Sequence, residues 1–366
     1  MNLTSLALLA ASGSKTPGRS ADPASCEITL FTSSRDGVAA FVVALVDGDN
    51  WRWAHTVLET AGFRRTGDGN RGISLHDPDH AHEALLALGA VARLTQTKLT
   101  ASSETYIGDF ARDLVEYLPG QWSVRVESYS MQVWQGDLAA CMWSEPLAAT
   151  LEKRRVRWAA VLQRDDGAEL AIIRDPHHEL YHVGALRPSS LQPAGLVTPP
   201  AGVTVQPEPA AAADAIRTRL LPSYTRAVLH CQVNSLEEDL DWARQTYGQG
   251  VLPDPPPTDL VDAFARFTTT APQVTAAVRA LATPTAHEAA FLQQVEGIVS
   301  LPARSDTAAV SRADRMAWWL AEGCEGLAEV ARHTISDSEP PVGETSHAPG
   351  APALPPASAR STGPRR

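Results

Sequence analysis

The pattern of apolar positions divides the chain into a mixed N-terminal part and a helical C-terminal part. Strand-like and helix-like spacings alternate over residues 26–190, whereas apolar residues recur every three or four positions over residues 216–335. A Pro- and Ala-rich segment, residues 191–215, lies between them and is predicted to be a linker. Residues 1–25 and 336–366 are rich in Ser, Pro, Gly and Ala without a periodic apolar face, which predicts a disordered leader and a disordered tail.

The clearest local pattern is an antiparallel meander over residues 156–187. Two strand-like stretches flank Asp165-Asp166-Gly167, and Asp-Gly favours a tight hairpin because Gly tolerates positive φ. Asp175-Pro176 predicts a second turn before a third stretch, residues 180–186. We therefore predict an α+β fold, in which an N-terminal domain with an antiparallel meander sheet and packed helices precedes an all-α helical bundle.

Other elements of the N-terminal domain follow from local signals. Asp77-Pro78 predicts a helix start, because an Asp N-cap accepts a backbone N–H and Pro lacks only a donor that is unpaired there. This helix carries Leu85, Leu88 and Leu94 inward, and Gly62 is placed to end another helix. The spacing also predicts strands at residues 26–32 and 72–75 and from residue 124, and helices at residues 36–46, 51–60, 106–118 and 146–154.

The helical half is typical of a bundle. Two capping boxes, Ser235-Leu-Glu-Glu238 and Thr285-Ala-His-Glu288, predict helix starts, and Ala271-Pro272 predicts another. A last helix over about residues 307–333 carries one apolar stripe. The spacing of three and four favours packing within the bundle, with a dimer seam or partner groove as the alternative. The stripe consists of Ala309, Ala313, Met316, Leu320, Leu327 and Val330.

Two adjacent tryptophans in the last helix predict a contact surface. Trp318 and Trp319 lie 100° apart on a helix, so both cannot occupy the centre of one apolar stripe. At least one should lie at the edge of the stripe, partly exposed, and exposed Trp is enriched at interfaces. We expect this helix to contact a second copy or another protein. The alternative is that the Trp packs flat against the bundle.

Composition and charge exclude several classes of protein. Hydrophobic residues make up 44% and charged residues 20%, which is typical of a globular protein. No run approaches the roughly 18 apolar residues of a transmembrane helix. The formal net charge is −11, and neither half has a basic surplus that could neutralise phosphates. We therefore expect neither a membrane nor a nucleic acid as a partner.

The cysteines indicate the compartment. They are far apart and include no CxxC pair, which disfavours a cysteine zinc site and a disulfide-dense secreted fold. The short apolar stretch near the N-terminus has no basic residue before it, unlike a secretory signal. We therefore expect a cytoplasmic protein without a cofactor, in which the thiols are structural or incidental. The four thiols are Cys26, Cys141, Cys231 and Cys324.

One motif suggests metal chemistry. The stretch from His178 to His182 reads HELYH and matches H-E-x-x-H, in which two His one helical turn apart bind Zn²⁺ and the Glu activates water. Here Asp175-Pro176 precedes it, and the context predicts a turn and a strand. On a strand the two His would lie about 13 Å apart, too far for one ion. We interpret them as turn and strand-edge histidines; a zinc-dependent hydrolase using His178, Glu179 and His182 is the alternative.

A second group of residues has metal-ligand types. It spans residues 76–83 and contains His76, Asp77, His80 and His82. On a helix, His80 and His82 point to different sides, and the acidic residues suit the positive end of the helix dipole. We therefore interpret this group as a solvated helix start, unless it converges in space with the HELYH stretch.

Several stretches resemble a group of uncharacterised actinobacterial proteins of the streptomycete type. The resemblance covers roughly residues 50–230 and implies no activity, cofactor or site residue. With no phosphate loop, nucleophile elbow or dinucleotide fingerprint in the chain, we expect a non-catalytic regulatory or adaptor protein. The stretches are Tyr106-Ile-Gly-Asp109, Leu118-Pro-Gly-Gln-Trp122, Val133-Trp-Gln-Gly-Asp137, Arg155–Leu186 and Leu221-Pro-Ser-Tyr224.

Overall fold

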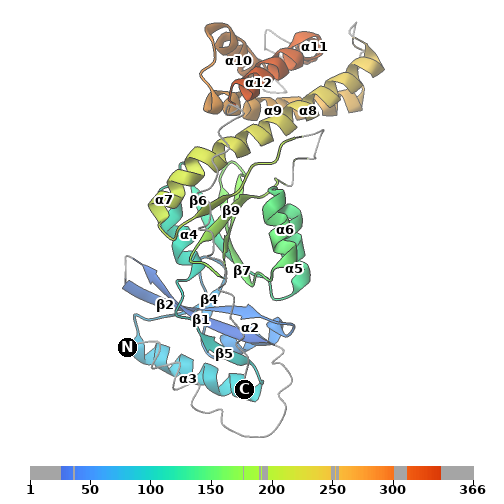
Figure 1. Cartoon of the computed structure of the whole chain (residues 1–366). Helices are drawn as coiled ribbons and strands as arrows, with labels where there is room; N and C mark the ends of the chain where they lie inside the picture. The colour runs from blue at the N-terminus through green and yellow to red at the C-terminus, as the bar shows by residue number, and fades with distance from the viewer. Residues whose placement is uncertain are drawn as a thin grey trace, which may run out of the picture.

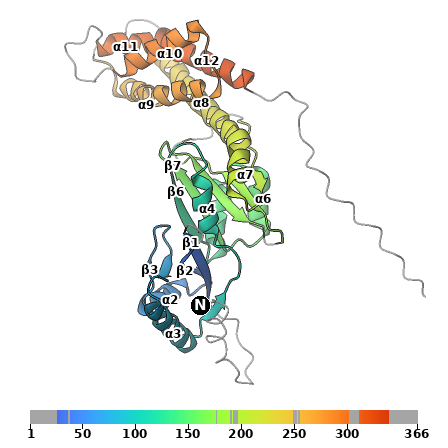
Figure 2. The same cartoon turned by 90° about the vertical axis from the view of Figure 1, so that its left-hand side faces the viewer.

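The molecule is elongated and places two sheets and a group of helices one after another along its length (Figure 1). A long helix joins the second sheet to the helices (Figure 2). This α+β architecture confirms the predicted fold class. The computed structural model describes residues 26–35, 38–175, 177–188, 191, 197–248, 252, 255–300 and 311–338.

The first sheet has five strands in the order β3-β4-β2-β1-β5. β1 pairs antiparallel with β2 and parallel with β5. Helices α2 (Trp51–Thr60) and α3 (Pro78–Leu94) share a core with one face of this sheet, around Ile28, Val42 and Leu88. The strands are β1 (Glu27–Arg35), β2 (Val38–Asp47), β3 (Arg64–Arg65), β4 (Arg71–Ser74) and β5 (Lys98–Ala101).

The predicted helix at residues 36–46 is wrong, because the described part of this segment is strand β2. Val42 packs with α2 and α3 on one face of the sheet, whereas Val43 and Leu45 join the core on the other face. A strand buried on both faces is apolar throughout and loses the alternation that marks a half-buried strand. At the end of α3, Leu94 is exposed rather than turned inward.

The second sheet confirms the meander and extends it to five antiparallel strands in the order β10-β9-β8-β7-β6. Gly167 has φ +87° in the predicted hairpin turn. Helices α5 (Gln132–Cys141) and α6 (Glu145–Lys153) pack on one face of the sheet. The strands are β6 (Trp122–Ser128), β7 (Trp158–Arg164), β8 (Glu169–Arg174), β9 (Tyr181–Ala185) and β10 (Val203–Val205).

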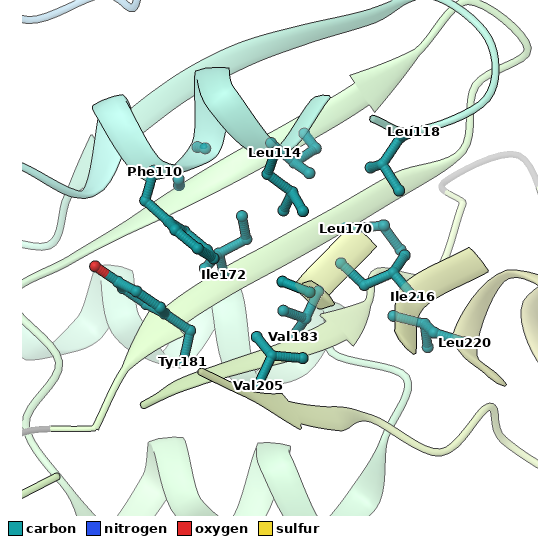
Figure 3. Close-up of a cluster of buried hydrophobic side chains, with 14 of the residues drawn as sticks. Phe110, Leu114, Leu118, Leu170, Ile172, Tyr181, Val183, Val205, Ile216 and Leu220 are labelled. Atoms are coloured by element: carbon teal, nitrogen blue, oxygen red, sulfur yellow. The ribbon is translucent and has the colours of Figure 1, made fainter. Parts of the chain in front are cut away.

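Helix α4 (Ile107–Val115), within the predicted helix at residues 106–118, covers the other face of the second sheet with its apolar side (Figure 3). The ring of Phe110 stacks on that of Tyr181, with centroids 4.1 Å apart. Leu114 lies beside them over Ile172, and Phe31 from the first sheet belongs to the same core. The two sheets therefore share one apolar core.

The segment predicted to be a linker, residues 191–215, contains β10 and helix α7 (Pro209–Ala215). α7 contains a run of alanines, and alanine has the highest helix propensity of all residues. Pro209 is tolerated because it occupies the first position of the helix. The π-helical turn η1 (Ile216–Leu220) and α8 (Leu221–Tyr247) continue α7 without a break. The predicted domain boundary at residue 215 is therefore wrong, because it falls inside a continuous helix.

α8 belongs to both halves of the molecule. Leu221 and Tyr224 near its start pack in the core of the second sheet, whereas Leu236 and Leu240 pack among the later helices. We call α8 from Leu229 onward, together with the later helices, the helical unit. The later elements are α9 (Thr258–Leu281), α10 (Ala286–Val299), α11 (Arg312–Trp318), η2 (Trp319–Gly323) and α12 (Cys324–Asp337).

Two of the predicted helix starts in this unit are wrong. Ser235 lies inside α8, because the sequence around it contains no Gly or Pro that would interrupt the helix. Pro272 lies inside α9, where Ala271 and Val274 on either side of it are fully buried. Packing of that continuous stripe outweighs the hydrogen bond that Pro cannot donate. The capping box at Thr285 is confirmed, with both of its hydrogen bonds present.

The last helix places its two tryptophans differently. Trp319 is fully buried, whereas Trp318 is partly exposed at the edge of the stripe. The Trp318 ring rests over Gly323, where an added Cβ would lie 2.4 Å from the ring. Phe267 and Phe291 are its aromatic neighbours, with centroids 6.4 and 6.5 Å away. The predicted edge position is confirmed for Trp318, which packs against the bundle.

The predicted disordered segments lie mostly outside the described residues. The whole predicted leader, residues 1–25, is among the residues left undescribed, as are residues 339–366 of the predicted tail and Ala309 of the last stripe. The last helix continues to Asp337, beyond its predicted end. Among the described helices, none is long and apolar enough to cross a membrane.

A buried polar network ties the two sheets together. Arg112 on α4 donates to Asp68 (3.2 Å) between β3 and β4, to Ser33 on β1 (3.0 Å) and to Asp109. The Tyr106 hydroxyl donates to Asp68 over 2.7 Å, and the Ser33 hydroxyl donates to Asp109 over 2.7 Å. Burial opposes the charge on Asp68, yet hydrogen bonds and Arg112 outweigh it and lower the pKa of Asp68. Burial raises the pKa of Asp109.

Candidate functional site

The HELYH stretch is not helical. His178 lies in a bend, and His182 lies on β9 opposite Thr204, whose hydroxyl is 3.0 Å from the His182 Nδ1. β9 pairs antiparallel with β8, and Tyr181 and His182 are part of this pairing. The predicted turn and strand are therefore confirmed for the described residues of this segment; Pro176 lies outside them.

The expected separation of the two histidines is wrong. His178 Nδ1 and His182 Nε2 lie 3.2 and 3.4 Å from the same carboxylate oxygen of Asp175, so these nitrogens are at most 6.6 Å apart (3.2 plus 3.4). The bend at residues 177–179 shortens the path that an extended strand would span. The Asp175 carboxylate also accepts the His177 backbone N–H, and these hydrogen bonds hold its pKa well below the ordinary value.

His178 and His182 share one hydrogen-bonding partner, the Asp175 carboxylate. In the part of the chain that the structure describes, no group of three or more His, Cys, Asp or Glu side chains is arranged to hold a metal ion. The second His group, residues 76–83, lies at the start of α3, as predicted. Asp77 accepts the His80 backbone N–H over 3.0 Å and caps this helix. His80 and His76 are exposed there.

Zinc is expected to raise the melting temperature of the native chain no more than that of His182→Ala. A folded site would stabilise the chain by about 2.7 kcal/mol at a zinc concentration 100 times Kd. Differential scanning fluorimetry with and without zinc measures this, with His76→Ala as a control for adventitious binding. A zinc-dependent rise that only His182→Ala abolishes would contradict the assignment and support the hydrolase alternative.

The helical unit carries a groove between α8, α10 and the last helix. We call it the acidic groove; its volume is about 1380 Å³. Its walls hold six carboxylates and two arginines. Its acidic residues are Glu237, Asp241, Glu288, Glu322, Glu325 and Glu329, and its other lining residues include Leu240, Arg244, Phe291, Gly326, Val330, Arg332 and His333.

Part of this negative charge is balanced inside the groove. Arg332 pairs with Glu237, and Arg244 pairs with Glu325 over 3.0 Å. Arg244 also donates to the backbone carbonyl of Leu320 over 2.7 Å, and this hydrogen bond joins α8 to the π-helical turn η2. These arginines are therefore committed to holding the helices together.

The His333 imidazole is 3.0 Å from Glu288. The Thr285 hydroxyl and backbone N–H, followed by His333, lower the pKa of Glu288 to about 2. The pKa of His333 is raised, first by its hydrogen bond to Glu288. Burial raises the pKa of Glu237 despite its arginine partner. The capping box at Thr285 therefore fixes one ionised carboxylate at the end of the groove.

Three carboxylates in the acidic groove, Asp241, Glu322 and Glu329, form no ion pair with any other residue that the structure describes. All three side chains are exposed, so water solvates them in the free protein. They come from α8, η2 and α12 and therefore surround the groove on two sides. The groove can attract a cationic group without breaking an existing ion pair.

The floor of the acidic groove is apolar. Leu240 is buried, and Phe291 and Val330 are half-buried. The Phe291 ring packs against the backbone of Gly326, where an added Cβ would lie 2.6 Å from it. An apolar floor beneath charged walls is the arrangement that accepts an amphipathic segment.

The surface of the last helix that lines the groove differs from the contact surface that the sequence predicts there, which centres on Trp318 and Trp319. The structure buries Trp319 and half of the stripe, and the open side of the same helix presents Glu322, Glu325 and Glu329. The recurrence of three glutamates at spacings of three and four was the available signal. The contribution of α8 was not visible, because it lies some 80 residues earlier in the chain.

No family model matches the chain, and no curated protein or solved structure is significantly similar to it.

Proposed function

We propose that this chain is a non-catalytic regulatory or adaptor protein of the cytoplasm that binds a basic segment of a partner protein in the acidic groove. The observation that carries the proposal is a set of three carboxylates around an apolar floor, Asp241, Glu322 and Glu329, which form no ion pair within the described part of the chain. The proposed partner surface comprises the last helix, on which the sequence also predicted a contact through other residues, together with α8 and α10.

The shape and charge of the groove select the kind of partner. Helices form its walls, and Leu240, Phe291 and Val330 form an apolar floor along it. An amphipathic helix with Leu on one face and Arg on its flanks satisfies both features, by the helix-in-groove mode of recognition. Opposite charges across the rim speed the encounter and disfavour acidic partners. A second copy of this chain, with a net charge of −11, is a poorer electrostatic match.

Binding of a defined basic peptide tests this function. We expect a helical peptide of about 18 residues, five turns long, with a Leu face and Arg flanks, to bind the full chain. Reversing two groove charges in Glu322→Lys/Glu329→Lys should weaken binding by about tenfold or more, because each lysine repels the peptide. Fluorescence anisotropy of the labelled peptide measures the affinity.

Two controls separate the groove from the overall charge. Glu83→Lys/Glu152→Lys changes the net charge equally, but on exposed positions of α3 and α6, and should bind the peptide as the native chain does. A peptide of the same composition with its Leu residues scattered should bind weakly, because it cannot cover the apolar floor. Equal losses in both double variants, or equal binding of both peptides, would count against the proposal.

A further inference from the structure

A cavity of about 690 Å³ lies between the two sheets, away from the acidic groove. One side is formed by β2, β4 and the segment around β3, and the other by β6 and the end of α4. Figures 1 and 2 show these elements next to each other where the first sheet meets the second. This volume is within the range of small-molecule sites, roughly 300–1,000 Å³.

The walls of the cavity are apolar and aromatic. Phe41 comes from β2, Val115 from α4, and Trp122 and Val124 from β6. All four side chains are only half-buried, although they lie between two sheets. Each would therefore bury further apolar surface against a ligand, at roughly 25 cal/mol for each Å² removed from water.

The inner end of the cavity is polar and already ordered. Ser33, Asp68 and Arg112 line it, and the network between the sheets holds all three in place. Asp68 shares the Arg112 guanidinium with Asp109 there. The inner end therefore supplies fixed polar groups that can orient a ligand, and the same hydrogen bonds that join the sheets hold these groups in place.

The mouth of the cavity is basic. Arg64 and Arg65 line it on β3, both exposed, and neither forms an ion pair within the described ranges of the chain. Glu116 also lines the cavity and is exposed. Two arginines against one glutamate leave one excess positive charge at the mouth. Arg guanidinium groups bind carboxylates through two parallel hydrogen bonds.

We propose that this inter-sheet cavity binds an aromatic carboxylate, with its ring between Phe41 and Trp122 and its carboxylate at Arg64 and Arg65. The aromatic walls favour a flat apolar body, since rings gain from stacked or edge-to-face contacts beyond their buried area. Arg64 and Arg65, which pair with no carboxylate among the described residues, favour an anionic group at the solvent end. This site is independent of the acidic groove, and the two proposals can fail separately.

Calorimetric titration of the full chain with 1-naphthylacetate, its neutral amide and octanoate tests the proposal. We expect the aromatic carboxylate to bind about tenfold more tightly than either of the other two, because the amide lacks the charge and octanoate lacks the ring. Arg64→Gln/Arg65→Gln should reduce its affinity to that of the amide. Equal affinity for octanoate, or for the amide, overturns the assignment.

Matched variants separate the cavity from general effects. Arg93→Gln/Arg219→Gln removes the same charge from exposed positions on α3 and η1 and should leave binding unchanged. Val124→Trp fills the cavity and should abolish binding of both naphthyl compounds. If Val124→Trp does not fold, comparison of Arg64→Gln/Arg65→Gln with Arg93→Gln/Arg219→Gln still tests whether the arginines at the mouth bind the carboxylate. Binding that survives Arg64→Gln/Arg65→Gln overturns the proposal.

Discussion

Replacing Trp319 by alanine is expected to lower the free energy of unfolding of the helical unit by about 3–5 kcal/mol. Trp319 is fully buried, and its ring lies 5.7 and 6.2 Å from those of Phe264 and Phe267. The surrounding helices cannot close over a gap of that size, so the variant loses both the transfer free energy and the packing contacts. Urea denaturation followed by circular dichroism measures the loss.

Two tryptophans in the same unit provide the comparison. Trp318→Ala should cost about 1–2 kcal/mol, because its ring is half-buried at the edge of the stripe. Trp242→Ala should stay within about 1 kcal/mol, since that side chain is 37% exposed. A Trp319→Ala variant no less stable than Trp318→Ala would contradict the assignment of Trp319 to the core. A change in molar mass with Trp318→Ala would instead reveal an interface at that ring.

Replacing Arg112 by methionine is expected to destabilise the folded chain by about 3 kcal/mol at neutral pH. The change leaves Asp68 and Asp109 buried without their shared guanidinium. Methionine keeps the length and much of the volume of the side chain, so the loss reports mainly on charge. The exposed Arg93→Met on α3 is the matched control and should change stability by less than about 0.5 kcal/mol.

The pH dependence distinguishes lost charge from lost packing. The folded-state pKa of Asp68 is lowered, so its ionised form stabilises the fold above the unfolded value near 3.9 and this contribution is lost as the pH falls. The stability difference between the native chain and Arg112→Met should therefore shrink as the pH falls towards about 4, because without Arg112 the buried carboxylates of the variant take up protons at a higher pH than Asp68 does in the native chain. A deficit that is constant from pH 7 to about 4 would mean that packing, and not the ion pairs, carries the effect.

The elements that sequence reasoning predicted are those with a local cause. The Asp77 cap, the Gly167 turn and the Thr285 capping box each depend on residues within three positions, and all three are present in the structure. Two of the errors come from segments whose state depends on distant packing. β2 lost its alternation by being buried on both faces, and Pro272 stays helical because a buried stripe continues past it.

The candidate sites show the same division. The sequence alone predicted that the HELYH stretch is not helical, and the structure confirms this for its described residues. It could not show that a bend brings His178 and His182 to the same carboxylate, because their separation depends on the backbone path between them. Nor could it show that α8 and the last helix face each other through Glu237 and Arg332, which are 95 residues apart.

The sequence by itself determined the α+β class, the meander, the helix starts at Asp77 and Thr285 and the acidic charge, because each depends on neighbouring residues or on composition. Tertiary structure alone decided which carboxylates find arginine partners and which line an open groove. It also decided that the first and second sheets enclose a cavity with Arg64 and Arg65 at its mouth. Ion pairing and enclosure are properties of surfaces that meet in space, and the chain brings those surfaces together from segments far apart in its sequence.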